Sequence, residues 1–165
     1  MKQTTKRKQN EDMALQVAKL QMEVISKALK TTSGSRRDDE RLPAREVKTF
    51  RQRLKVMFKA LEVQHGFCAR QSYWCCTTCG TYAIEMEAAL GMKWAFYHGQ
   101  DADGIPQGDV CIAFGVAGPT CRDEDIAEAG RLVCVAAKAA GLNAEWRGDI
   151  RERVLVSYPR KGNGA

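Results

Sequence analysis

Three cysteines stand close together near the middle of the sequence, at Cys75, Cys76 and Cys79. Cys76 and Cys79 form a CxxC motif, which we expect to lie in a tight turn over residues 75–80, ahead of a short helix over residues 81–90. Closely spaced thiols can exchange disulfides, bind a metal ion, or simply pack as small side chains. The motif by itself leaves these three interpretations open.

Each interpretation requires different surroundings for the thiols. A redox pair needs the amino end of a helix to stabilise a thiolate and lower its pKa. A zinc site needs four ligands, so the candidate ligands are Cys75, Cys76, Cys79 and His98, with Cys121 as a further candidate. In the structural interpretation the thiols fill space at the end of a strand. Zinc sites are usually marked by two pairs of ligands, and this sequence has no second CxxC and no HxxxH motif. Zinc is therefore a candidate cofactor that rests on one ligand pair only.

A second group of polar residues, His98, Gln100 and Asp101, follows a predicted strand over residues 93–97 and opens a glycine-rich loop. A histidine can shuttle protons near neutral pH, and an aspartate can orient it.

If strand 93–97 lies beside a strand over residues 67–74, this histidine and the cysteines meet at one sheet edge, where a Cys–His pair can act as a nucleophile. The candidate catalytic residues are therefore Cys76, Cys79, His98 and Asp101. The alternative is that His98 and Asp101 only fasten the loop to the backbone.

Positive charge is concentrated in the first third of the chain. Residues 1–60 carry 16 Lys and Arg against 7 Asp and Glu, whereas residues 61–165 carry 10 against 13. Lys48, Arg51, Lys55 and Lys59 recur every three or four residues along the helix predicted from residue 44, so they share one face. A polyanion such as nucleic acid could bind there without sequence specificity, through Arg45, Lys48, Arg51, Lys55 and Lys59. The alternative is a solvated face that pairs with nearby carboxylates.

Composition excludes some classes of protein. No apolar run approaches the 18–20 or so residues of a membrane span. The charged N-terminus is not followed by the apolar region of a secretory signal, so we expect a cytoplasmic protein. The number of cysteines, seven, is odd, which argues against a complete disulfide framework.

Apolar periodicity divides the chain into an N-terminal amphipathic helix within residues 1–30, a polar linker over residues 31–43, and a compact domain over residues 44–160. Helices are predicted over residues 44–64, 81–90 and 123–140, and strands over residues 67–74, 93–97, 109–115, 143–146 and 153–158. This order favours an α+β fold of two layers, with a mostly antiparallel sheet and helices on one face. The predicted core contains Phe50, Leu54, Met57, Leu61, Trp94, Phe96, Ile112, Phe114, Leu132, Val135, Trp146 and Val154, and Trp74 is expected to pack there too.

From residue 44 to residue 158 the sequence resembles an uncharacterised bacterial family known only as a domain of unknown function. The resemblance rests on a CCxTCG motif and a YHxQD motif, with flanking glycines, an Arg-Gln pair and a tryptophan. The matching residues are Gly66, Arg70, Gln71, Cys75, Cys76, Cys79, Gly80, Tyr97, His98, Gln100, Asp101, Gly141 and Trp146. The resemblance implies a domain assignment and no activity.

The sequence therefore does not reveal a biochemical function. Because an amphipathic N-terminal helix needs something to cover its apolar face, our first hypothesis is a non-enzymatic module that binds a protein partner or self-associates through that helix. The alternative is a zinc- or thiol-dependent protein built on the cysteines, His98 and Asp101. A non-specific nucleic-acid binder is a further alternative.

Overall fold

A computed structural model describes residues 41–160. The predicted N-terminal helix and most of the predicted linker lie outside the described residues. At the end of that linker, Leu42 is buried and its backbone N–H donates to the carbonyl of Pro106 at 2.8 Å. This part of the linker therefore belongs to the folded domain.

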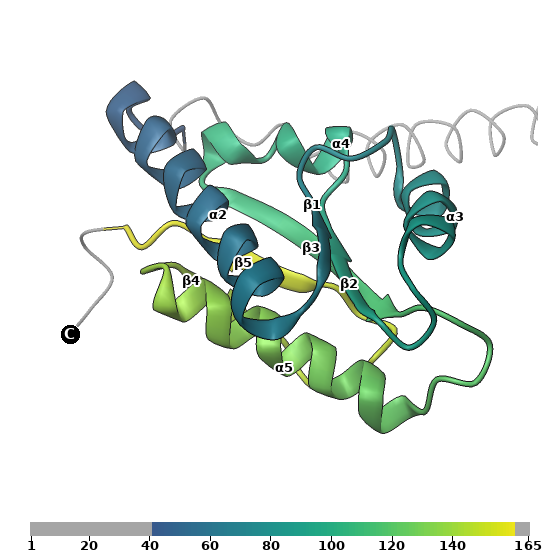
Figure 1. The fold of residues 1–165 in the computed structure, drawn as a ribbon. Coiled ribbons are helices and arrows are strands. Elements are labelled where there is room, and N and C mark those ends of the chain that lie inside the picture. The colour runs from purple at the N-terminus through teal and green to yellow at the C-terminus, as the bar shows by residue number, and fades with distance from the viewer. Residues whose placement is uncertain (1–40, 161–165) are drawn as a thin grey trace, which may run out of the picture. The chain divides into compact units, whose positions relative to one another are not determined.

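Five strands form one sheet in the order β1-β2-β3-β5-β4 (Figure 1). They are β1 (Cys68–Arg70), β2 (Lys93–Phe96), β3 (Asp109–Val116), β4 (Asn143–Glu145) and β5 (Val154–Ser157). Strands β1 and β2 are parallel, and the other three pairs are antiparallel. The predicted α+β class and the mostly antiparallel sheet are confirmed.

Helix α2 (Ala44–His65) follows the predicted bounds closely. Pro43 precedes its first turn, where a missing N–H costs nothing. Gly66 ends it in the left-handed conformation, with φ 67°, and donates its N–H to the carbonyl of Leu61. The four predicted core residues of α2 are all buried, at helical spacing: Phe50, Leu54, Met57 and Leu61. Phe58 is buried beside them.

Helix α5 (Asp123–Ala139) lies beside α2 over the same face of the sheet (Figure 1). Its first turn is acidic, which complements the helix dipole. Small residues and Val133 form its buried side, whereas Val135 is 54% exposed. The prediction of Val135 as a core residue is wrong, because two residues along a helix turn a side chain about 200° away from its neighbour on the buried side.

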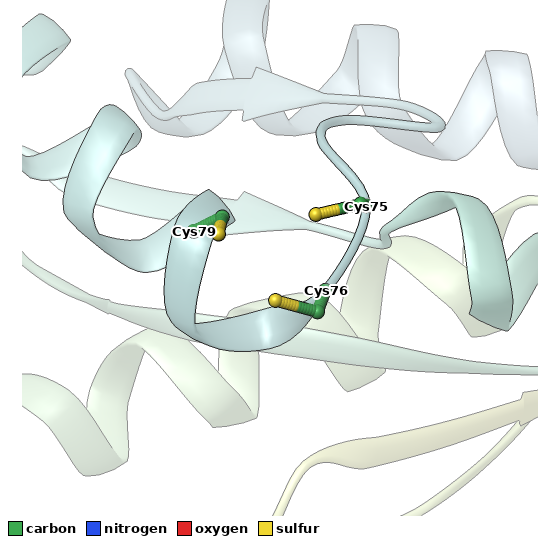
Figure 2. Close-up of side chains that lie close together, drawn as sticks. All are labelled: Cys75, Cys76 and Cys79. Atoms are coloured by element: carbon green, nitrogen blue, oxygen red, sulfur yellow. The ribbon is translucent and has the colours of Figure 1, made fainter.

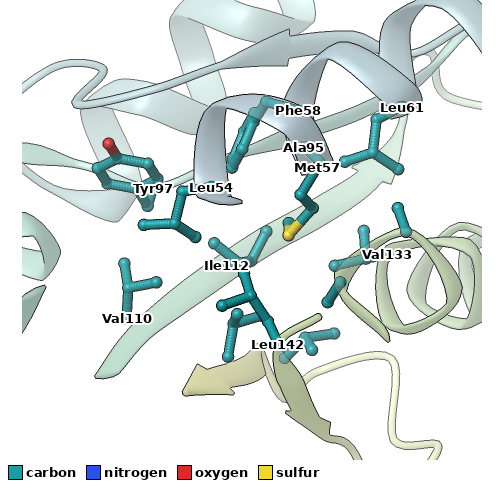
Figure 3. Close-up of a cluster of buried hydrophobic side chains, with 14 of the residues drawn as sticks. Leu54, Met57, Phe58, Leu61, Ala95, Tyr97, Val110, Ile112, Val133 and Leu142 are labelled. Carbon is teal, nitrogen blue, oxygen red and sulfur yellow. The ribbon is translucent and has the colours of Figure 1, made fainter. Parts of the chain in front are cut away.

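The main core lies between these two helices and the sheet. In Figure 3, side chains of α2 meet Ala95 and Ile112 of the sheet and Val133 of α5. Leu132 and Trp146 are half-buried against this main core. The other predicted core residues of the strands are buried, either here or in a second cluster on the opposite face of the sheet.

Helix α3 (Thr77–Glu87) differs from the prediction of helices on one face. Side chains alternate along a strand. Ala95 therefore faces α2 and α5, while Trp94 and Phe96 point to the opposite face and pack with Ile84 of α3. Two large aromatic rings on that face have to be covered, and the narrow apolar side of α3 covers them.

The region between β1 and α3 also departs from the prediction. Strand β1 ends at Arg70, not at Trp74, because Ser72 and Trp74 adopt left-handed conformations with φ 49° and 59°, which an extended strand cannot contain. Trp74 is 57% exposed and is not a core residue. Helix α3 begins at Thr77, so residues 77–80 form its first turn and not a separate tight turn.

Candidate thiolate metal centre

A short irregular segment, residues 71–76, carries the chain from β1 to α3. The N–H of Tyr73 donates to the carbonyl of Tyr97 at 2.9 Å, and the N–H of Gly99 donates to the carbonyl of Trp74 at 2.9 Å. These bonds hold the segment beside the end of β2. The cysteines that follow are therefore attached to the sheet and not to a free loop.

The three cysteines converge at the amino end of α3. Figure 2 shows Cys75 and Cys76 on the segment that enters the helix and Cys79 on its first turn, with the sulfur atoms close to one another. All three Sγ atoms lie within 4.8 Å of one another. Cys75 and Cys79 are exposed and Cys76 is half-buried. The cluster is compact and open to solvent.

The two thiols of the CxxC motif have opposite pKa shifts. The backbone N–H of Cys79 lowers the pKa of the Cys76 thiol below its ordinary 9.0, with help from the thiols of Cys79 and Cys75 and the N–H of Thr78. The thiol of Cys76, followed by that of Cys75, raises the pKa of Cys79 to about 11.

Cys76 is the N-cap residue of α3 but does not close a cap hydrogen bond through its side chain. The N–H groups of Cys79 and Thr78, in the first turn of the helix, nonetheless stabilise a negative Cys76 sulfur electrostatically and so lower its pKa. One sulfur of the cluster is thus prepared to be a thiolate while its neighbour keeps a proton.

A clamp around Glu87 holds the far end of α3 against the sheet. Arg70 of β1 donates from Nε to Glu87 Oε1 at 3.0 Å and also through its terminal nitrogen. Tyr73 donates its hydroxyl to the other carboxylate oxygen at 2.9 Å. Arg70 Nη1 lies 3.5 Å from Glu62 of α2, so one arginine links the sheet to both helices. The clamp lowers the pKa of Glu87 through the Arg70 hydrogen bond.

His98 and Asp101 lie in a different hydrogen-bonded group. His98 is 6% exposed and caps the short helix α4 (Gly99–Ala102), which together with the 3-10 helix η2 (Ile105–Gln107) occupies the predicted loop. The N–H of Asp101 donates to His98 Nδ1 at 3.2 Å. In the neutral ring the proton is therefore on Nε2, which lies 3.0 Å from Asp101 Oδ2.

Arg153, which directly precedes β5, completes this second group. Its Nη1 donates to the two carboxylate oxygens of Asp101 at 2.9 and 3.0 Å and lies 3.3 Å from His98 Nε2. These contacts correspond to the alternative in which His98 and Asp101 fasten the loop. Nothing in the sequence pattern pointed to Arg153, because it lies 52 residues from Asp101.

The structure thus brings together three of the predicted site residues, Cys75, Cys76 and Cys79. All seven cysteines and both histidines of the chain are in the part that the structure describes. Among the described residues, these three thiols are the only group of at least three potential metal ligands, and His98 and Cys121 are not in it. Catalysis by Cys76, Cys79, His98 and Asp101 stays a prediction.

The five basic residues predicted to bind nucleic acid lie along α2 and are all exposed: Arg45, Lys48, Arg51, Lys55 and Lys59. Lys59 Nζ lies 3.8 Å from Glu62 on the same helix. They share the side of α2 that faces away from the core.

No helix within residues 41–160 is both long enough and apolar enough to span a bilayer.

Comparison with curated proteins and with solved structures finds no match. A family model matches residues 5–160, which confirms the resemblance seen in the sequence. The match starts well before residue 44, so the N-terminal segment is part of the family's domain and not an addition to it. The chain belongs to this family, which is described as a domain of unknown function (DUF6891).

Proposed function

We propose that the protein binds a soft divalent metal ion, with zinc as the first candidate, through the thiolates of Cys75, Cys76 and Cys79. The observation that supports this is the convergence of three sulfur atoms within 4.8 Å. Zinc–sulfur bonds of about 2.3 Å place the sulfurs of a tetrahedral site about 3.8 Å apart. Small rotations of the three side chains are therefore sufficient to bring the thiols onto one ion.

The electrostatics of the cluster favour a cation. Thiolates, not thiols, are metal ligands, and the lowered pKa of Cys76 supplies the first one. The ion then displaces the remaining protons, including the one that Cys79 holds in the metal-free protein. The reducing cytoplasm predicted from the sequence would keep the thiols available.

Metal content of protein purified without chelator tests this proposal. We expect one zinc per chain, and we expect cobalt(II) in its place to give thiolate-to-cobalt charge-transfer absorption. Cys76→Ser with Cys79→Ser should abolish both. Cys121→Ser is the matched control, because Cys121 lies outside the cluster. The proposal would be overturned by two results together: metal below one ion per chain that chelators remove, and a cobalt spectrum that is the same for the double variant as for the wild type.

Thiol–disulfide exchange is a second candidate function, and the opposite pKa shifts of Cys76 and Cys79 favour it. The Cys76 thiolate would attack a substrate disulfide and release one substrate thiolate. Cys79, after losing its proton, would attack the Cys76 sulfur and release the second, which leaves a Cys76–Cys79 disulfide and a reduced substrate. Cys79→Ser should then accumulate the mixed disulfide with a disulfide reagent, detectable by mass spectrometry. Absence of any such adduct would exclude this function.

Two hypotheses from the sequence stay as proposals. Partner binding or self-association through the N-terminal helix concerns residues outside the described range, and light scattering of the full chain would test self-association. A monomer at high concentration would exclude self-association.

Nucleic-acid binding by α2 is supported by the exposure of its basic residues.

A further inference from the structure

The three-cysteine site can draw no fourth cysteine or histidine from its own chain. The other four cysteines and both histidines are described residues, and none belongs to the cluster. Residues 1–40 contain no cysteine and no histidine. Zinc held by three protein ligands keeps its fourth position for an exchangeable ligand. If the proposed metal binding is correct, this position is available to an external donor.

An exposed apolar row runs along α3 from the cysteine cluster. Cys79, Tyr82 and Met86 are spaced by three and four residues, so they share the side of α3 opposite to its buried residues. Tyr82 is 73% exposed and Met86 75%, and Leu90, just beyond the helix, is 83% exposed. Trp74, which directly precedes Cys75 in the chain, is 57% exposed. Large exposed apolar side chains next to a polar site are typical of a surface that binds a partner.

We propose that the occupant is a cysteine-bearing segment of a partner protein, which packs along this apolar row and supplies the fourth thiolate. The partner's thiol gives its proton to solvent, and its sulfur replaces a water molecule on the ion. A thiolate suits an ion that three thiolates already select for softness. Aromatic and methionine side chains are also the residues that bind peptides and their sulfur atoms well.

Charge supports a fourth thiolate at this place. A divalent ion with four thiolates carries two net negative charges, and the cluster lies at the amino end of α3, where the helix dipole is positive. Within residues 41–160 no carboxylate belongs to the cluster, so no Asp or Glu of this part of the chain takes the place of the partner's thiolate.

Cobalt(II)-loaded protein tests this inference, with two synthetic peptides as probes. One peptide has a single cysteine flanked by leucines, and the other has serine in place of the cysteine. We expect the cysteine peptide to increase the thiolate-to-cobalt absorption and the serine peptide to leave it unchanged. Tyr82→Ser with Met86→Ser should weaken binding of the cysteine peptide about tenfold or more, because each lost apolar contact costs on the order of 1.5 kcal/mol and each 1.4 kcal/mol is tenfold.

Val63→Ser is the matched control variant, because Val63 is 68% exposed on α2, away from the cysteines. It should bind the cysteine peptide like the wild type. Bound cobalt that does not respond to the cysteine peptide overturns this inference and leaves the proposed function standing. Failure to bind cobalt overturns both. If the cobalt absorption already corresponds to four thiolates without peptide and light scattering shows a dimer, the fourth thiolate comes from a second copy of this chain. That result would also overturn the inference.

Discussion

Gly80 lies directly against the ring of Phe96. A Cβ at position 80 would be 2.4 Å from Phe96 Cε2, a buried ring atom with no room to move aside. This contact lets the first turn of α3, which carries Cys79, sit close to β2. The glycine that follows the last cysteine of the motif is therefore a packing requirement of the site, which the sequence motif did not explain.

Gly80→Ala should destabilise the protein and weaken metal binding. Overpacking costs about 1–3 kcal/mol, and the better helix propensity of alanine returns about 1 kcal/mol, so we expect a net loss of about 1 kcal/mol. Denaturant unfolding and a cobalt titration would measure the two effects. Thr78→Ala, on the exposed side of the same turn, should show neither. An alanine variant as stable and as avid as the wild type would contradict the role of this contact.

Arg70→Met should loosen α3 without unfolding the domain. Arg70 and Glu87 are each more than a third exposed, so solvent screening reduces the loss to about 1 kcal/mol or less. Hydrogen exchange of the α3 amides should become faster while that of α2 is unchanged. Arg131→Met, which removes an exposed pair with Glu128 on α5, is the control and should leave α3 exchange as it is. If the α3 amides exchange at the same rate in Arg70→Met as in Arg131→Met, the clamp does not hold the helix.

Alkylation should discriminate between the thiols of the CxxC motif in the metal-free protein. The pKa of Cys76 lies below 9.0 and that of Cys79 at about 11, so at a pH between these values Cys76 is mainly thiolate and Cys79 mainly thiol. We expect iodoacetamide to modify Cys76 first, and modification of Cys79 to accelerate only as the pH approaches its own pKa. Peptide mass spectrometry would follow both sites. Preferential modification of Cys79 would reverse the assignment of the thiolate.

Arg153→Met should destabilise the domain and leave metal affinity unchanged. The Asp101 side chain is only 9% exposed, so it would lose its hydrogen-bonded cation in a poorly solvated place. We expect a loss of about 2 kcal/mol in denaturant unfolding, the usual range for a hydrogen bond to a charged group. Arg151→Met, at an exposed position nearby, is the control. Reduced cobalt affinity in Arg153→Met alone would connect this group to the metal site after all.

Salt dependence should decide whether α2 binds nucleic acid. If its five basic side chains contact phosphates, the logarithm of the affinity for duplex DNA should fall with the logarithm of salt concentration at a slope of about −4 to −5. Lys48→Gln with Lys55→Gln should reduce that slope by about 2. Arg147→Gln with Arg151→Gln, exposed residues away from α2, should not change it. No binding at low salt would exclude nucleic acid as a partner.

The sequence by itself was sufficient for most helices and for the fold class. Helix α2 could be located within a residue, because its apolar spacing is regular and Pro43 and Gly66 limit it at both ends. Three of the candidate ligands could also be found, because Cys75, Cys76 and Cys79 lie within five positions of one another where the chain enters a helix. Such features depend on neighbours along the chain, which the sequence displays directly.

Only the tertiary structure decided the rest. The left-handed turn at Trp74 and the packing of α3 on the second face depend on what β2 presents there, and Arg153 reaches Asp101 across 52 positions of sequence. The sequence left open whether His98 meets the cysteines or only fastens the loop together with Asp101, whereas the structure places it against Asp101 and Arg153. Hydrophobic periodicity states which side of an element is apolar, but not which distant element will cover it, so contacts between such elements appear only when the chain is folded.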